Sequence, residues 1–134
     1  MGSPRILLAD DSPEMRERVE NLLRSRFDIV GSVADGRQAL DAVRVLNPDI
    51  LVTDISMPSV DGLEVASRLR DSRSKTKVIF LTVHEDTDFV EAGFAVGAVA
   101  YVLKGRMGSD LICAIEAISQ GRTFCSALNN RQPR

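Results

Sequence analysis

Short apolar segments alternate with longer amphipathic segments along most of this chain. The apolar segments cover residues 6–9, 27–33, 50–53, 77–81 and 100–103. Apolar runs of this length between helical segments are typical of parallel strands that helices cover on both faces. The pattern therefore predicts an α/β fold of five βα units, (βα)5, with a doubly wound parallel five-stranded sheet. The more polar segment 27–33 is expected at an edge of that sheet.

Helix-start and helix-stop residues lie between these strands. The first helix begins at Pro13, with Ser12 as its N-cap, and the others are expected over about 36–46, 61–72, 86–96 and 109–120. Asp61 and Glu64 have the spacing of a capping box. Residues 122–134 are polar and aperiodic, which predicts one domain over residues 1–121 followed by a tail or a truncated linker.

Charge and composition exclude several classes of function. The chain has 134 residues, 17 Lys and Arg against 19 Asp and Glu, and a net charge of −2. A basic face for nucleic-acid phosphates is not expected, so we predict no direct nucleic-acid binding. No apolar stretch approaches the roughly 20 residues of a membrane span, and no signal-peptide core is visible, so a cytoplasmic protein is predicted. Cys113 and Cys125 lack the spacing of a metal or redox motif, and we assign them no role.

Five polar side chains stand at the ends of the predicted strands. They are Asp10 and Asp11 after the first strand, Asp54 after the third, Thr82 after the fourth and Lys104 after the fifth. The carboxyl ends of parallel strands share one edge of the sheet, and ligands of open α/β sheets bind outside that edge. The sequence therefore predicts a ligand site where these five side chains converge.

The residue types at this edge favour a metal ion and a phosphoryl group. Three carboxylates repel one another unless a cation neutralises them. Hard oxygen ligands without a His or Cys cluster favour Mg²⁺, for which Mn²⁺ can substitute. The Lys104 ammonium and the Thr82 hydroxyl suit an anion beside the metal. Taken singly, each residue also has a structural interpretation, since adjacent Asp residues often cap helices, and the lone His84 is typical of a structural or solvated loop histidine.

The chain resembles the receiver domains of bacterial two-component response regulators from residue 6 to about residue 121. The motifs that carry the resemblance are the pair Asp10-Asp11, DISMPSVDG at 54–62, LT at 81–82 and GAVAYVLK at 97–104. The resemblance implies the flavodoxin-like receiver fold with strand order 2-1-3-4-5. It also implies that Asp54 is the nucleophile that accepts a phosphoryl group from a phosphohistidine on a sensor histidine kinase.

Further site residues follow from the same resemblance. It implies that Asp11 and Asp54 ligate Mg²⁺ directly, Asp10 through water, and Ser56 through its backbone carbonyl. Lys104 would pair with the phosphoryl oxygens. The resemblance further implies that Thr82 moves toward the phosphoryl group and Tyr101 rotates inward. This would remodel the face made by the fourth helix, the fifth strand and the fifth helix and promote a homodimer.

Residues 81–86 and 101–104 more narrowly resemble the NarL/FixJ (LuxR-type) regulators, in which a helix-turn-helix DNA-binding domain follows the receiver. This implies transcription regulation through an output domain that is absent from this sequence. The chain would be a signalling domain and not an enzyme on other substrates, because it would catalyse only its own phosphorylation and dephosphorylation. The alternative is a stand-alone or degenerate receiver that acts as a protein-interaction module.

Two departures from the usual receiver pattern stand beside the site. Gly105 follows Lys104 where many receivers have proline, which removes the residue type that favours a cis peptide there. Val83 stands where many receivers have Ala, and we expect its larger side chain to slow small phosphodonors. Ser56 and His84 flank Asp54 and are expected to set how fast water reaches a phosphoaspartate.

Two other classes fit the residues less well. A haloacid dehalogenase-type hydrolase needs a second Asp two residues after its nucleophile, where this chain has Ser56. A nucleotide- or flavin-binding module needs a Gly-rich loop after the first strand, where this chain has acidic and hydroxyl side chains.

Overall fold

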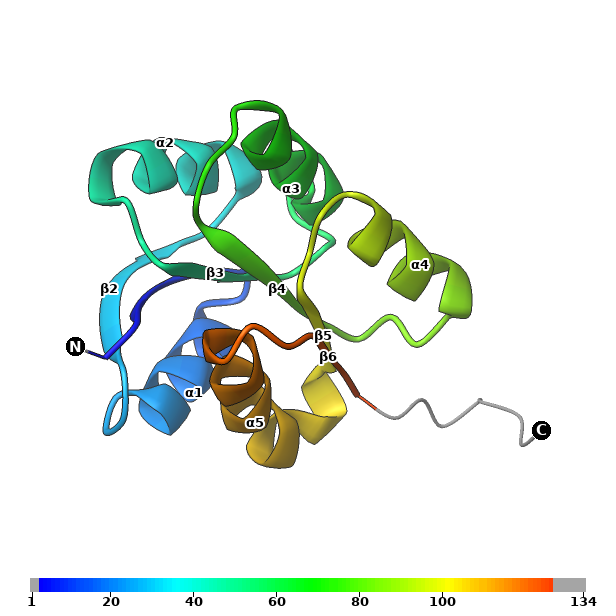
Figure 1. Cartoon of the computed structure of the whole chain (residues 1–134). Helices are drawn as coiled ribbons and strands as arrows, with labels where there is room; N and C mark the ends of the chain where they lie inside the picture. Colours follow the sequence, from blue (N-terminus) through cyan, green and yellow to red (C-terminus); the bar gives the residue numbers. More distant parts are fainter. Residues whose placement is uncertain (1–2, 127–134) are drawn as a thin grey trace.

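A single parallel sheet forms the centre of the computed structural model, which describes residues 3–126 (Figure 1). Its strands follow the order β2-β1-β3-β4-β5-β6, and every neighbouring pair is parallel. The strands are β1 (Arg5–Ala9), β2 (Asp28–Val33), β3 (Ile50–Thr53), β4 (Lys77–Thr82), β5 (Ala100–Leu103) and β6 (Phe124–Cys125). The doubly wound α/β fold and the order of the first five strands are as predicted.

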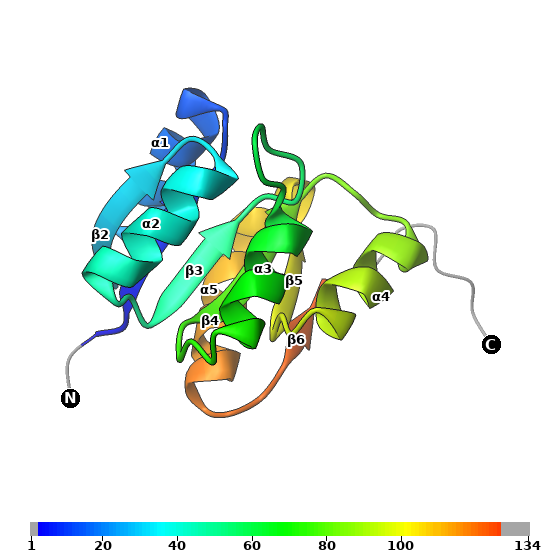
Figure 2. The same cartoon turned by 90° about the horizontal axis from the view of Figure 1, so that it is seen from above.

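Helices cover both faces of this sheet (Figures 1 and 2). They are α1 (Pro13–Leu23), α2 (Gly36–Leu46), α3 (Gly62–Asp71), α4 (Thr87–Ala95) and α5 (Met107–Ser119), with a 3-10 turn, η1 (Lys104–Arg106), before α5. Helices α2, α3 and α4 pack on one face and α1 and α5 on the other, so the core has two layers. Strands β1, β3, β4 and β5 lie inside the sheet, which explains their continuous apolar sequence.

The predicted helix signals are present in the structure. The Ser12 hydroxyl accepts a hydrogen bond from the Met15 amide at 3.2 Å, and Pro13 opens α1. The Asp61 carboxylate accepts one from the Glu64 amide at 2.8 Å at the start of α3. In a complete capping box the Glu64 carboxylate would accept a hydrogen bond from the Asp61 amide. Here that carboxylate pairs instead with Arg68 at 2.9 Å.

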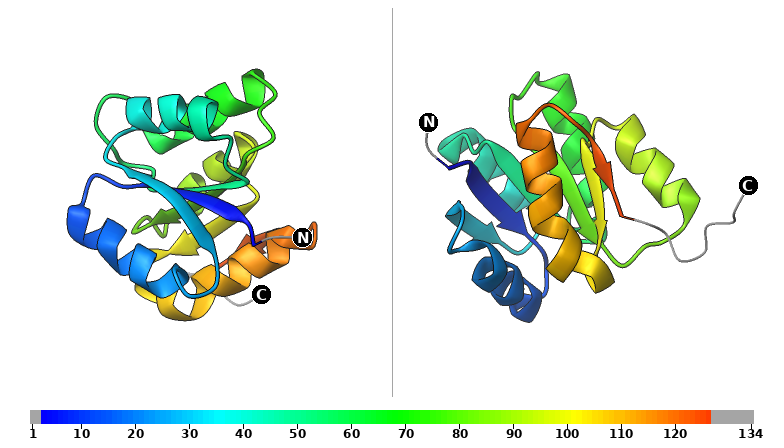
Figure 3. Two further views of the ribbon diagram at one scale, coloured as in Figure 1. Left: turned by 90° about the vertical axis from the view of Figure 1, so that its left-hand side faces the viewer. Right: turned by 60° about the horizontal axis from the view of Figure 1, so that its bottom comes forward.

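The sheet has one strand more than predicted, because β6 lies in the segment that was expected to be an aperiodic tail. Phe124 pairs with Ala100 and Cys125 with Tyr101, so β6 extends the sheet beyond β5 (Figure 3, right). A strand of two residues is too short to show a periodic pattern in the sequence. Its pairing depends on the free edge of β5. The remaining predicted tail, residues 127–134, lies outside the described residues.

The segment after β5 shows one smaller difference, and it also settles the peptide at Lys104. Helix α5 begins at Met107, two residues before the predicted start, because η1 leads directly into it. The Lys104–Gly105 peptide is trans, as are the other peptide bonds over residues 3–126. Within the same range, no helix combines the length and the apolar character that crossing a membrane requires.

Candidate functional site

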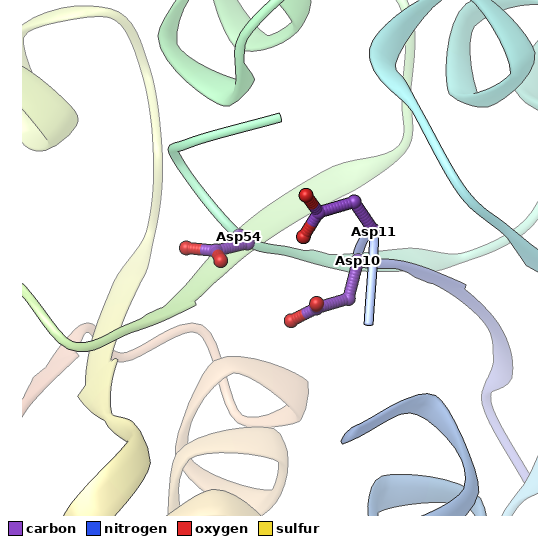
Figure 4. Close-up of side chains that lie close together, drawn as sticks. All are labelled: Asp10, Asp11 and Asp54. Atoms are coloured by element: carbon purple, nitrogen blue, oxygen red, sulfur yellow. The ribbon is translucent and has the colours of Figure 1, made fainter. Parts of the chain in front are cut away.

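Three carboxylates gather at the carboxyl ends of β1 and β3 (Figure 4). Asp10 and Asp11 follow β1, and Asp54 follows β3. The two strands are paired with Ala9 opposite Thr53, which brings their ends level. One carboxylate oxygen from each Asp lies within 4.8 Å of the others. Asp10 and Asp54 are buried, at 6% and 7% exposure, and Asp11 is exposed.

Backbone groups hold the two buried carboxylates in place. Asp10 Oδ1 accepts a hydrogen bond from the Ser12 amide at 2.9 Å, and Asp54 Oδ1 accepts one from the Ile55 amide at 2.7 Å. Helix α3 approaches Asp54 closely at Gly62, where a Cβ would lie 2.2 Å from the Asp54 carbonyl oxygen. Glycine is therefore the residue that lets α3 start directly beside Asp54.

The Lys104 ammonium neutralises part of this negative charge. Its Nζ lies 2.8 Å from Asp10 Oδ2 and 2.9 Å from Asp54 Oδ2, and the side chain is 13% exposed. Burial by itself lowers the pKa of Lys104, but the hydrogen bonds and charges of Asp10 and Asp54 outweigh burial and raise that pKa above its usual value. Lys104 is therefore a fixed cation at neutral pH, in contact with two of the three acidic groups.

A hydroxyl and an open cavity complete this end of the sheet. Thr82 is fully buried at the end of β4, and its Oγ1 accepts a hydrogen bond from the His84 amide at 3.4 Å. Val83 is 66% exposed. It lines a cavity of about 320 Å³ together with Lys104 and Glu85. The three Asp residues do not line this cavity, so it lies beside Lys104 and not over the acidic cluster.

His84 connects the loop after Asp54 with α4 and β5. Its Nε2 is 2.9 Å from the Ser56 hydroxyl oxygen, and its ring stacks on Phe89 with centroids 4.1 Å apart. The Tyr101 hydroxyl donates to the His84 carbonyl at 2.8 Å. Tyr101 is fully buried, and burial, followed by the charges of Cys125, Asp54 and Asp86, raises its pKa. His84 is thus a partly exposed loop residue with three partners, which agrees with the structural alternative of the prediction.

The donor set fits a small, hard divalent cation. Carboxylate oxygens are the preferred ligands of such ions, and these three come from two adjacent loops that backbone hydrogen bonds hold in place. This fit supports a metal site at Asp10, Asp11 and Asp54. The predicted role of the Ser56 carbonyl stays a prediction, because the contact that the structure gives for Ser56 is the one from its side chain to His84.

The five predicted strand-end residues do converge at one edge, as their positions in the sequence indicated. Two contributors were not predicted. Arg16, on the first turns of α1, donates from Nη1 to the Asp10 carbonyl at 2.6 Å, and Phe89 supports the His84 ring. Neither had a distinguishing signal, because Arg16 belongs to the charged face of α1 and Phe89 to the apolar anchors of α4.

A comparison with protein families decides the classification. Residues 6–116 match the model described as the response regulator receiver domain. The chain belongs to this family. The matched range includes all five strand-end residues, and structural neighbours include response regulators of the NarL and LuxR families.

Individual relatives agree with this assignment. An uncharacterized transcriptional regulatory protein of Bacillus subtilis, YxjL, is 32% identical over 122 residues, which cover 90% of this chain and 56% of the relative. The chain thus spans a little over half the length of such relatives.

Solved structures give the same fold. The receiver domain of the response regulator NarL from Mycobacterium tuberculosis has a TM-score of 0.87 at 28% identity and covers 91% of this chain and all of that one. A LuxR-family response regulator from Aurantimonas sp. SI85-9A1 has a TM-score of 0.87 at 33% identity, covering 92% of this chain and 89% of its own.

Proposed function

We propose that this receiver is a phosphorylation-dependent switch in which Asp54 accepts a phosphoryl group from the phosphohistidine of a sensor histidine kinase. The observation that supports this most directly is the position of Lys104, whose ammonium reaches Asp54 at 2.9 Å and Asp10 at 2.8 Å beside a cavity open to solvent. A nucleophilic carboxylate and a fixed cation in contact with it are two elements that phosphoryl transfer needs.

The reaction is a displacement at phosphorus. A carboxylate oxygen of Asp54 forms the new P–O bond, the bond from phosphorus to the imidazole nitrogen breaks, and that nitrogen keeps the electron pair. The Ile55 amide and Lys104 hold the Asp54 carboxylate in one orientation. Lys104 then stabilises the charge on the transferred oxygens, and water reverses the modification. Catalysis is limited to the protein's own phosphorylation and dephosphorylation.

Asp10, Asp11, Asp54 and the Ser56 carbonyl would hold Mg²⁺, for which Mn²⁺ can substitute. When bound, the ion supplies positive charge against the phosphoryl oxygens. Asp10 and Asp11 need no large movement for this role, since their oxygens and that of Asp54 already lie within 4.8 Å of one another.

The switch is formed by Thr82 and Tyr101. Phosphorylation adds about 1.5 to 2 negative charges and three acceptor oxygens near the Thr82 hydroxyl. Movement of Thr82 alters the loop at His84, whose carbonyl accepts the Tyr101 hydroxyl. The face formed by α4, β5 and α5 then changes and promotes a homodimer. Because the relatives include transcriptional regulators of which the match covers only 52% to 56%, the proposed output is DNA binding by a domain outside this sequence. The cytoplasmic location stays a prediction.

The test is the intact mass of the purified chain after incubation with acetyl phosphate or phosphoramidate, with and without Mg²⁺. We expect a gain of one phosphoryl group that requires Mg²⁺ and is absent in Asp54→Asn. Absence of any gain with these donors and with a phosphorylated histidine kinase would leave a degenerate receiver that acts as an interaction module.

A further inference from the structure

The segment after α5 returns to the sheet at the strand that carries Tyr101 and leads to Lys104. The Phe124 amide donates to the Val99 carbonyl at 3.2 Å, and the Ser126 amide donates to the Tyr101 carbonyl at 2.9 Å. Ser126 is 1% exposed, although it lies in a polar stretch of sequence. Such burial of a small polar residue requires partners for its hydroxyl group.

The Ser126 hydroxyl joins two elements. It accepts a hydrogen bond from the Leu103 amide at 3.1 Å and donates one to Asp110 Oδ2 at 2.7 Å. Leu103 is the last residue of β5 and directly precedes Lys104. The hydroxyl thus supplies the buried Leu103 amide with its acceptor, at the point where the chain leaves β5 for the site.

Asp110 anchors this arrangement from α5. The carboxylate is nearly buried, and it also accepts hydrogen bonds from Arg106 Nε at 3.0 Å and from the Ser109 hydroxyl at 3.0 Å. Burial alone raises the pKa of Asp110, but the hydrogen bonds from Ser126, Arg106 and Ser109 outweigh burial and lower that pKa. The Asp110 carboxylate is therefore ionised at neutral pH. It connects Ser126, the residue after β6, with η1 and α5, the two elements that follow β5.

We propose that Ser126 and Asp110 are positioning residues for Lys104, so that pairing of the segment 124–126 with β5 is coupled to phosphoryl transfer at Asp54. This inference rests on the function proposed above. The residues act through the backbone of Leu103 and η1 and touch neither the acidic cluster nor a phosphoryl group. Where the pairing of this segment also changes the affinity of the Asp54 site for a phosphoryl analogue, linkage requires that occupation of the site stabilise the pairing by the same free energy.

A purely structural role gives a different expectation. If Ser126 only closes the edge of the sheet, its loss lowers stability but leaves phosphorylation of the folded chain unchanged. If it positions Lys104, a displacement of the ammonium by a fraction of an ångström slows the transfer itself, since transfer rates depend steeply on alignment.

The first test compares Ser126→Ala with Ser119→Ala in the full chain. Ser119 is the matched control, because its hydroxyl also makes a hydrogen bond on α5, to the Ile115 carbonyl at 2.8 Å, but far from Lys104. Phosphorylation by acetyl phosphate is followed by intact mass at saturating Mg²⁺ and donor, after circular dichroism has shown that each variant is folded. We expect the rate of Ser126→Ala to fall about tenfold and that of Ser119→Ala to match wild type.

The second test uses only the wild-type chain, so it does not depend on the folding of a variant. Hydrogen exchange of the Leu103 and Ser126 amides is measured with Mg²⁺ and with beryllofluoride, an analogue of the phosphoryl group. We expect beryllofluoride to slow exchange at both amides and to have no such effect in Asp54→Asn.

The two hypotheses fail in distinguishable ways. A wild-type chain that is phosphorylated, with Ser126→Ala at the wild-type rate and exchange at both amides unaffected by beryllofluoride, overturns the coupling and leaves the proposed function intact. A wild-type chain that no donor phosphorylates overturns the proposed function, and the positioning role of Ser126 with it.

Discussion

Replacement of Lys104 by methionine tests whether its ammonium is the counter-charge of the acidic cluster. The change keeps most of the buried aliphatic stem but removes the cation that lies 2.8 Å from Asp10 and 2.9 Å from Asp54. Both carboxylates are more than nine-tenths buried, so water replaces the lost interaction incompletely. Breaking a fully buried ion pair costs about 3–5 kcal/mol. Because this site opens to solvent on one side, we expect the free energy of unfolding to fall by about 2–3 kcal/mol in EDTA.

Mg²⁺ should compensate for the lost ammonium. A ligand that binds only the native state at 100 times its dissociation constant adds about 2.7 kcal/mol, and the variant should bind Mg²⁺ more tightly because no ammonium competes for the same oxygens. The deficit of Lys104→Met should therefore shrink as Mg²⁺ is added.

The assay is urea unfolding followed by circular dichroism, in EDTA and over a series of Mg²⁺ concentrations. Lys75→Met is the control, because it removes the same charge from an exposed lysine at the opposite end of the sheet, where a change within about 0.5 kcal/mol is expected. Equal stability of Lys104→Met and wild type in EDTA, or an equal gain of both from Mg²⁺, would refute this account of the site.

Four further predictions follow from the same region. Gly62→Ala should lower the free energy of urea unfolding by about 1–3 kcal/mol, because the added Cβ would meet a backbone carbonyl at 2.2 Å, whereas Gly108→Ala, with nothing within 4 Å, should not. Tyr101→Phe should reduce the loss of folding stability above about pH 10. The single tyrosine has a raised pKa in the folded chain, so above that pH the unfolded chain loses its proton while the folded chain keeps it, and this difference favours unfolding of the wild type. Val83→Ala should raise the rate with acetyl phosphate several-fold, and an unchanged rate would remove the steric argument. His84→Ala should shorten the lifetime of the phosphorylated chain, because it removes the 2.9 Å contact between His84 and Ser56 and lets water reach Asp54 faster. An unchanged lifetime would contradict this.

The sequence was most informative where local chemistry decides the structure. The bounds of β3, β5 and α2 were predicted to the residue. Continuous apolar runs mark buried parallel strands, and Asn47, in the left-handed conformation, followed by Pro48 stops α2. The edge position of β2 also followed from its mixed composition. These features depend on short-range preferences that a single sequence displays.

Contacts between distant segments were predictable only in part. The strand-end rule brought Asp10, Asp54 and Lys104 to one edge, but it did not tell which carboxylates the ammonium would contact. The pair Ser126 and Asp110 gave no signal at all, since one lies in a polar stretch and the other in the first turn of a helix, where acidic residues are common. Their contact exists because β6 pairs with β5, and this pairing is a property of the assembled sheet.

Strand β5 connects these observations. On one side, Tyr101 reaches the His84 carbonyl and, through that loop, the Ser56 hydroxyl. Leu103, the last residue of β5, directly precedes Lys104. On the edge of β5 that pairs with β6, the Tyr101 carbonyl and the Leu103 amide form hydrogen bonds with Ser126. A strand of four residues therefore contacts the loop at His84 and the segment 124–126, and it leads directly to Lys104, which contacts the acidic cluster. Because packed elements shift together, we expect a change at Lys104 to alter how residues 124–126 pair with β5.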